Sequence, residues 1–82
     1  MVIEKIDMLL EILRGVLSEE DFYNAKELVY YGEYGVAIEL ICTQLYEYDK
    51  CIYIKEKNLI MDIINEMELS IDFLDGIKII SD

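Results

Sequence analysis

The sequence contains no histidine and no proline, and only four of its 82 residues are glycine. Without histidine, the chain lacks the commonest general base of enzymes and the commonest protein ligand of transition metals. Without proline, and with so few glycines, nothing interrupts long helical stretches, and the turns between helices are expected to be short. These absences favour a compact series of helices and argue against catalysis.

Cysteine is also scarce, with Cys42 and Cys51 the only two in the chain. Their spacing fits neither a zinc site nor a disulfide framework, and Cys42 is more simply interpreted as a small packing residue than as a nucleophile. Residues 49–60 lack the alternating oxygen ligands of a calcium loop, and no glycine-rich phosphate loop is present. We therefore expect no metal, no cofactor and no enzymatic activity.

Basic residues are few, since seven face 18 acidic residues and the net charge is −11. Such a chain is not expected to bind nucleic acid or anionic membranes, because both require Lys and Arg. The acids are either a solubility device or a means of attracting a basic partner. The longest uncharged run, residues 40–46, is far too short to span a bilayer, and the N-terminal segment carries charges within its apolar stretch. We expect a cytoplasmic, reduced protein.

Apolar residues recur at three- and four-residue steps along most of the chain, which predicts helices. The pattern predicts one all-α domain over residues 1–82, a small bundle of four helices plus a short C-terminal helical segment. The helices are expected over about residues 2–16, 19–31, 33–48 and 53–67, and the short segment over 71–76. Residues 76–82 leave two alternatives open, a frayed tail or a segment that packs back on the bundle.

Turn and cap residues agree with these helices. Ser18 can cap the second helix, and Asp21 completes the spacing of a capping box. Gly32 is suited to a left-handed stop after the second helix. On the third helix, one side is expected to face the core and the other to face solvent. The expected core side is Ala37, Leu40, Ile41, Gln44, Leu45 and Tyr48, and the expected outer side is Glu39, Cys42, Thr43 and Tyr46.

Seven tyrosines are many for a chain of this length, and several must lie near the surface. Tyrosine is amphipathic and enriched at protein interfaces, and neighbouring carboxylates can pair with Lys and Arg of a partner. The plainer interpretation is that these tyrosines cover the edges of the bundle and bind water. As a set, acids mixed with tyrosines indicate a surface for a basic protein. The candidate binding residues are Tyr23, Glu27, Tyr30, Glu33, Glu39, Tyr46, Glu47, Tyr48 and Asp49.

Residues 28–49, "LVYYGEYGVAIELICTQLYEYD", resemble the central segment of MafI-type immunity proteins, which are small acidic bacterial proteins that neutralise a polymorphic toxin. The matching positions are Leu28, Val29, Gly32, Glu33, Tyr34, Gly35, Ala37, Glu39, Leu40, Ile41, Cys42, Leu45, Tyr46 and Glu47. Within this motif, Gly32 and Gly35 look like backbone requirements, and Ala37 lets the second helix approach closely. The flanking helices match only in length and pattern. The family usually has a proline and a serine before the fourth helix, and this chain has "CIYIKEK" there, which puts the start of that helix in doubt.

The resemblance implies a cytoplasmic antidote whose partner is the C-terminal domain of a cognate toxin in contact-dependent growth inhibition. Many such toxins are nucleases with basic active sites, which an acidic inhibitor can cover as a phosphate mimic, or it can bind an outer site. Two other functions stay open. One is a tetratricopeptide-like adaptor, although no second repeat is present. The other is a small dimerising regulatory domain, which the net charge of −11 opposes.

Overall fold

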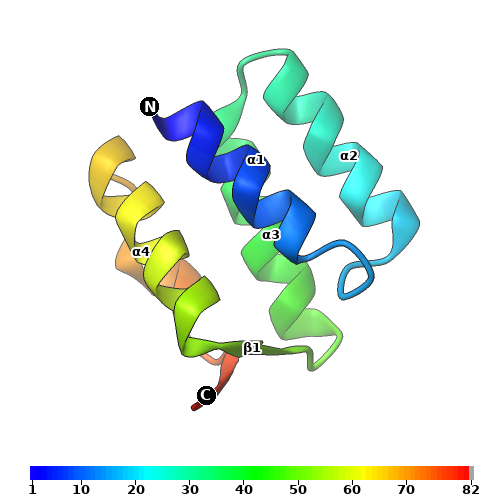
Figure 1. Cartoon of the computed structure of the whole chain (residues 1–82), viewed down its shortest axis with the longest axis vertical. Helices are drawn as coiled ribbons and strands as arrows, with labels where there is room; N and C mark the ends of the chain where they lie inside the picture. Colours follow the sequence, from blue (N-terminus) through cyan, green and yellow to red (C-terminus); the bar gives the residue numbers. More distant parts are fainter. Residues whose placement is uncertain (82) are drawn as a thin grey trace.

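Four α-helices dominate the computed structural model, which describes residues 1–81 (Figure 1). They are α1 (Val2–Ile12), α2 (Glu19–Tyr30), α3 (Tyr34–Glu47) and α4 (Ile54–Met67). The remaining elements are two short strands, β1 (Cys51–Tyr53) and β2 (Lys78–Ile80), and one 3₁₀ turn, η1 (Ile71–Leu74). The predicted class, a small all-α bundle, is confirmed, with a minor two-stranded sheet added to it.

The helices pack mainly as two pairs, α2 on α3 and α1 on α4. In Figure 1, α1 and α3 form the middle of the molecule, with α2 on one side and α4 on the other. The turn η1 packs against both α3 and α4. Lys5 on α1 donates a hydrogen bond of 2.8 Å to the Glu66 carboxylate on α4, and this bond lowers the pKa of Glu66. Both side chains are partly exposed, so the pair adds little stability.

The core consists mainly of apolar side chains from all four helices, together with Ile52 of β1. Each large apolar side chain that is buried contributes roughly 1.5–3 kcal/mol relative to an exposed one, so this core is the main source of stability. The side chains with at most 1% of their surface exposed are Ile6, Leu9, Leu10, Leu13, Ala25, Ala37, Ile38, Ile41, Leu45, Ile52, Ile60, Ile63 and Ile64.

The first helix ends at Ile12, four residues before the predicted end. Gly15 adopts φ +90°, a left-handed conformation that closes a turn and is rare for residues with a side chain. The backbone N–H groups of Val16 and Leu17 both donate to the carbonyl of Leu13, at 2.9 and 3.0 Å. Leu17 therefore reaches the core from a tight turn.

The start of α2 matches the predicted cap in part. The Ser18 hydroxyl accepts a hydrogen bond from the Asp21 backbone N–H at 3.1 Å. The Asp21 carboxylate does not complete a capping box. It instead accepts a hydrogen bond of 2.9 Å from the Gln44 side-chain amide, so the buried Asp21 joins the start of α2 to the last turns of α3.

Replacing Ser18 with alanine is expected to lower the free energy of unfolding by about 1 kcal/mol, because the cap hydrogen bond is lost. For a domain of this size, that loss lowers Tm by roughly 4–8 °C. Thermal denaturation monitored by circular dichroism measures this decrease in Tm. The matched control is Asn24→Ala, an exposed position inside the same helix where alanine is the better helix former. Equal Tm values for both variants would show that the cap is unimportant.

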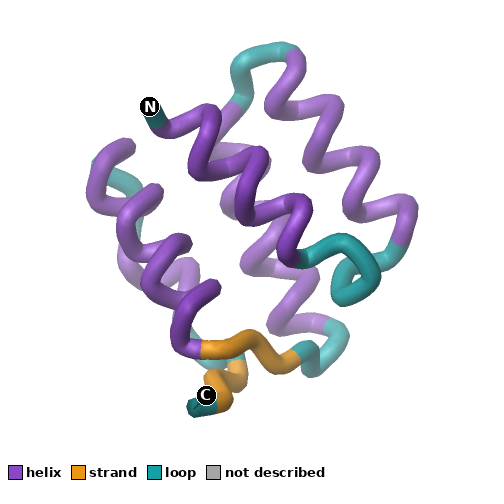
Figure 2. The backbone as a smooth tube through the Cα atoms, in the orientation of Figure 1, coloured by secondary structure: helices purple, strands orange, loops and turns teal. Residues whose placement is uncertain are grey.

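Residues 76–81 pack back on the bundle, which decides between the two alternatives left open by the sequence for this part of the chain; Asp82 lies outside the described residues. The strands β1 and β2 pair in parallel, with Cys51 opposite Lys78 and Tyr53 opposite Ile80. Ile52, at the centre of β1, and Ile77, just before β2, are buried. Figure 2 shows both strands together at the end of the molecule near the C-terminus.

The fourth helix begins at Ile54 although the chain has neither the proline nor the serine of the resembling family at that point. The Glu56 carboxylate accepts a hydrogen bond of 2.8 Å from the backbone N–H of Tyr53. Glu56 is buried, so this bond satisfies a carboxylate that would otherwise be costly to bury. Glu56, in the first turn of α4, therefore takes the helix-capping role of the serine that the resembling family has at this point.

Candidate protein-binding surface

Helix α3 is turned relative to the predicted orientation. Cys42, expected on the outer side, is buried, and so is Ile38, which the predicted core side omitted. Tyr48, expected in the core, lies just beyond the helix and is exposed. The reason is that α3 is covered on two sides, by α1 and α2 on one and by η1 on another. The prediction from sequence periodicity assumed that only one side of α3 packs against other elements.

Burial raises the pKa of the Cys42 thiol to about 12, whereas Cys51 is exposed. Only the thiolate reacts with disulfide reagents, so in the folded protein at pH 8 we expect Cys51 to react quickly and Cys42 very slowly. Titration with Ellman's reagent should give one fast thiol in the native protein and two after denaturation. The variant Cys51→Ser should leave almost no fast reaction. Two fast thiols in the native protein would contradict the burial of Cys42.

An acidic hollow lies between α3 and η1. Its volume is about 200 Å³, and it carries three carboxylates and no basic side chain. Among residues 1–81, none of these three carboxylates takes part in an ion pair. We call this hollow and its rim the α3–η1 surface. Its lining residues are Glu39, Cys42, Thr43, Tyr46, Asp72, Phe73 and Asp75.

Tyr46 forms one wall of the α3–η1 surface by lying against the turn that follows η1. A Cβ atom added to Gly76 would lie 2.5 Å from the Cε1 atom of the Tyr46 ring. Gly76 also has φ +81°, which favours glycine. This close approach of backbone and ring holds the η1–β2 turn beside α3 and positions the Tyr46 side chain, which is still 55% exposed.

Gly76→Ala is therefore expected to destabilise the fold for two reasons, a left-handed backbone and a collision with Tyr46. The matched control is Gly32→Ala, because Gly32 has φ +78° but open space around its Cα atom. The control should lose roughly 1–2 kcal/mol through backbone strain alone. Gly76→Ala should lose about 1–3 kcal/mol more through overpacking. Urea denaturation measures both values, and adding Tyr46→Ala to Gly76→Ala should remove the excess. Equal losses at the two glycines would exclude the collision.

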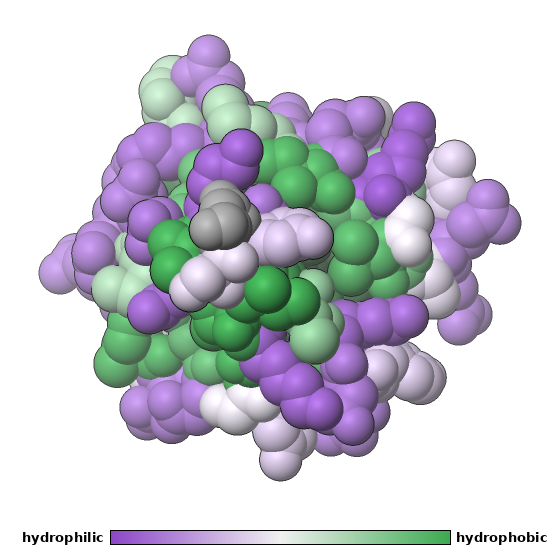
Figure 3. All heavy atoms as spheres, turned by 60° about the horizontal axis from the view of Figure 1, so that its bottom comes forward, coloured by the Kyte–Doolittle hydropathy of each residue, from purple (hydrophilic) through white to green (hydrophobic). Residues whose placement is uncertain are grey.

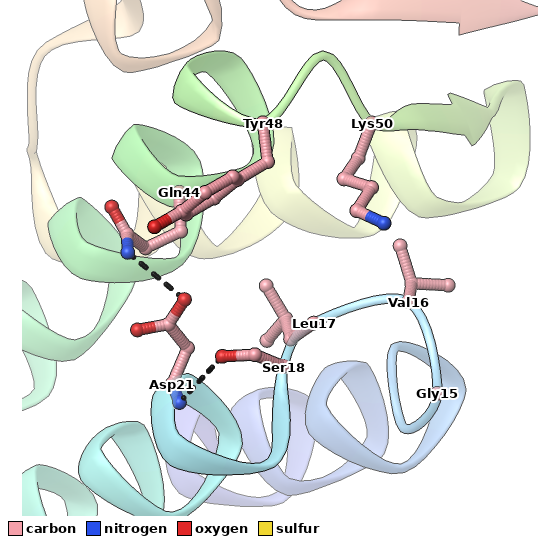
Figure 4. Close-up of a pocket in the computed structure, with 8 residues that line it drawn as sticks. All are labelled: Gly15, Val16, Leu17, Ser18, Asp21, Gln44, Tyr48 and Lys50. Atoms are coloured by element: carbon pink, nitrogen blue, oxygen red, sulfur yellow. Dashed lines mark hydrogen bonds between the residues drawn. The ribbon is translucent and has the colours of Figure 1, made fainter.

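A second hollow, of about 300 Å³, lies between the α1–α2 loop and the end of α3. Figure 4 shows Lys50 reaching toward this loop, Tyr48 directed toward the Gln44 side of the hollow, and the Asp21 carboxylate turned toward Gln44. The polar groups that the hollow buries are thus already paired within the protein. This second hollow is lined by one lysine together with apolar loop residues. None of its lining residues belongs to the α3–η1 surface.

The α2 candidates lie on another side of the molecule. Tyr23, Arg14 and Phe22 line a hollow of about 430 Å³ beside the α1–α2 loop. Tyr30 is 83% exposed and packs edge-to-face on Tyr31, with ring centroids 5.1 Å apart, beside the α2–α3 turn. These aromatic side chains are open to solvent but are separated from the η1 side of α3.

The structure therefore divides the candidate residues predicted from the sequence. Glu39 and Tyr46 belong to the α3–η1 surface. The others are exposed elsewhere, on α2, in the α2–α3 turn or at the end of α3, where Asp49 lies 3.5 Å from the Lys78 ammonium. Gly32 has the left-handed φ that the resemblance requires, but Gly35 does not, and an added Cβ there would make an ordinary contact with Leu69.

Sequence analysis missed the contribution of η1 to this surface. Asp72 and Asp75 were not candidates, because nothing in the local pattern placed residues 71–76 beside α3. A local signal did exist, since the Ser70 hydroxyl accepts a hydrogen bond of 3.2 Å from the Asp72 backbone N–H and fixes the turn. The position of η1 against α3, however, depends on long-range packing of Phe73 and Leu74 on the core.

Comparison of the chain with protein-family models, with curated proteins and with solved structures finds no match. Within residues 1–81, no group of three or more His, Cys, Asp or Glu side chains is placed to hold a metal ion. None of the described helices has the length and apolar character needed to cross a membrane. The surface therefore has to be interpreted from its own residues.

Proposed function

We propose that this chain is an immunity protein that binds and neutralises the toxin domain encoded beside it. The observation that carries the proposal is the α3–η1 surface, where Glu39, Asp72 and Asp75 surround a hollow without a basic neighbour. The resemblance of residues 28–49 to MafI-type immunity proteins supports it independently. The protein acts in the cytoplasm as a binding protein and not as an enzyme.

Charge and shape both favour a basic partner at this surface. Unpaired carboxylates attract Lys and Arg, and the ring of Tyr46 can cover the aliphatic stem of such a side chain or lie against its cation. The net charge of −11 adds long-range attraction, which raises association rates most strongly at low salt. A nuclease fits these requirements well, because it needs a positively charged groove for its phosphate substrate.

The mechanism of inhibition depends on which part of the toxin domain the α3–η1 surface binds. In an active site that accepts phosphates, the three carboxylates take the place of substrate oxygens and exclude nucleic acid. We propose this direct competition as the mechanism. If it is correct, a short oligonucleotide and the immunity protein should exclude each other from the toxin. Simultaneous binding would instead place the contact at an outer site.

Co-expression tests the function. The chain is produced together with the C-terminal toxin domain encoded by the neighbouring gene, and growth and a one-to-one complex are followed. We expect rescue of growth and co-purification, with a complex that dissociates more readily as salt is added. A matched experiment with a toxin from an unrelated system should show neither. Absence of both complex and rescue with the cognate domain would reject the proposal and favour the adaptor or dimerising alternatives.

A further inference from the structure

Residues 70–81, which we call the strap, are attached to the rest of the molecule at few points. Within the described part of the chain, their backbone hydrogen bonds stay inside the strap, apart from the pairing of β2 with β1. The ion pair that joins the strap to the preceding elements is Lys78 with Asp49, at 3.5 Å. Both side chains are exposed, so this pair adds little stability.

The strap also buries little apolar surface. Ile77 is the only buried residue among residues 70–81, whereas Ile71, Ile79 and Ile80 each expose more than a third of their surface. Figure 3 views the molecule from this end and shows apolar surface at the centre of the face, bordered by hydrophilic side chains. Because apolar burial is the main source of stability, we expect the strap to be held less firmly than the four helices.

A hinge precedes the strap. Glu68 ends α4 with φ +55°, in the left-handed region that residues with a side chain rarely adopt. The Leu69 backbone N–H donates to the carbonyl of Ile64 at 2.9 Å, which closes the last turn of α4. The helix is therefore complete without the strap, and the chain can change direction after Leu69 without breaking a hydrogen bond of α4.

Where the strap meets α3, it completes the α3–η1 surface and covers Cys42, which is 3% exposed. The strap contributes Asp72 and Asp75 to the hollow, and α3 contributes Glu39. Docking thus brings three carboxylates together in a hollow that has no basic side chain, and the repulsion between them opposes docking. A basic partner that binds these carboxylates removes this repulsion.

We propose that the strap detaches from α3 and β1 as a unit, and that its docking assembles the α3–η1 surface. In the open state, Asp72 and Asp75 move away from Glu39, so a partner of that surface binds only the docked state. Such a partner therefore holds the strap closed, because a ligand shifts an equilibrium toward the state that it binds. The opening does not depend on the proposed function, whereas its coupling to a toxin rests on that function.

The reactivity of Cys42 measures the opening. The Cys51→Ser protein is reacted with Ellman's reagent at pH 8, at urea concentrations below its unfolding transition. We expect the rate without urea to be at least tenfold higher than global unfolding allows. It should rise with urea less than half as steeply as global unfolding does, because the strap is a small part of the surface that unfolding exposes. A rate equal to the global value, with the full urea dependence, would overturn the proposal.

Two variants, both made in the Cys51→Ser protein, separate opening of the strap from unfolding of the whole chain. Ile77→Ala removes the buried anchor of the strap outside the hollow, so Cys42 should react at least tenfold faster. Ser18→Ala weakens the cap of α2, which opening leaves intact, so the rate should stay within twofold. Equal acceleration by both variants would contradict a separate opening. The urea dependence needs neither variant and decides the question if Ile77→Ala does not fold.

Hydrogen exchange in the complex with the catalytically inactive toxin domain tests the coupling. The hydrogen-bonded amides of β1 and β2 exchange when the strap opens, and neither strand lines the hollow. At a free toxin concentration about 100 times Kd, their exchange should slow about 100-fold. Unchanged exchange in a saturated complex would overturn the coupling. Absence of any complex would reject the proposed function and the coupling with it, whereas Cys42 alone decides whether the strap opens.

Discussion

Reversing the charges of Glu39, Asp72 and Asp75 to lysine is expected to weaken binding of the cognate toxin domain by at least about a hundredfold. Loss of one partner from a desolvated charge pair typically costs about 2–5 kcal/mol, and each 1.4 kcal/mol is a factor of ten in Kd. The three carboxylates line one hollow and lack basic neighbours, so their reversal places three cations against a basic partner. Isothermal titration calorimetry measures Kd, and growth rescue should fail in parallel.

The control for this variant is Asp7→Lys with Glu20→Lys and Glu68→Lys. These acids are exposed on other helices or at their ends, and the control has the same net charge as the test variant. Long-range attraction is therefore reduced equally, and only the local contact differs. The control should bind within about tenfold of the unaltered protein, because screening limits the effect of distant charges at physiological salt. If both variants weakened binding equally, the α3–η1 surface would contribute only to the overall charge and would make no specific contact with the toxin domain.

Ile60→Ala is expected to leave the protein largely unfolded near body temperature. Ile60 is fully buried in α4, and replacing a buried isoleucine with alanine costs roughly 2–5 kcal/mol. The total stability of a domain this small is on the order of 5 kcal/mol, so most of it would be lost. Circular dichroism should show a Tm lower by more than about 10 °C, or no cooperative transition.

The control is Ile12→Ala, the same chemical change at the exposed end of α1, where 45% of the side chain is accessible. It should lower the free energy of unfolding by less than about 1 kcal/mol. Urea denaturation compares the two variants directly. A loss at Ile60 no larger than that at Ile12 would contradict the burial of Ile60 in the core.

The helical architecture follows from local patterns. Apolar spacing predicted α1, α2 and α4 and most of their buried side chains, because a regular 3.6-residue period is a strong local signal. Ser18 and Gly32 marked real helix ends, since caps and left-handed stops depend on only a few neighbouring residues. These are features that a single segment of chain determines by itself.

Long-range packing determines what the sequence could not show. The pairing of β1 with β2 joins residues that are far apart in the chain, and three-residue strands are too short to carry a periodic signal. The position of η1 decides that Cys42 is buried and that Asp72 and Asp75 lie beside Glu39. Composition indicated an acidic, tyrosine-rich surface, but only the packing of η1 shows which acids share one hollow.

The most direct measurement of the central claim is an NMR titration of the ¹⁵N-labelled chain with the unlabelled, catalytically inactive toxin domain. The account predicts that the largest amide shifts occur in residues 39–46 of α3 and 72–76 of the η1 turn, with little change at Asp7 or Asn24. Shifts of equal size across all acidic surfaces, or shifts confined to the exposed tyrosines of α2, would contradict it and move the binding surface away from α3 and η1.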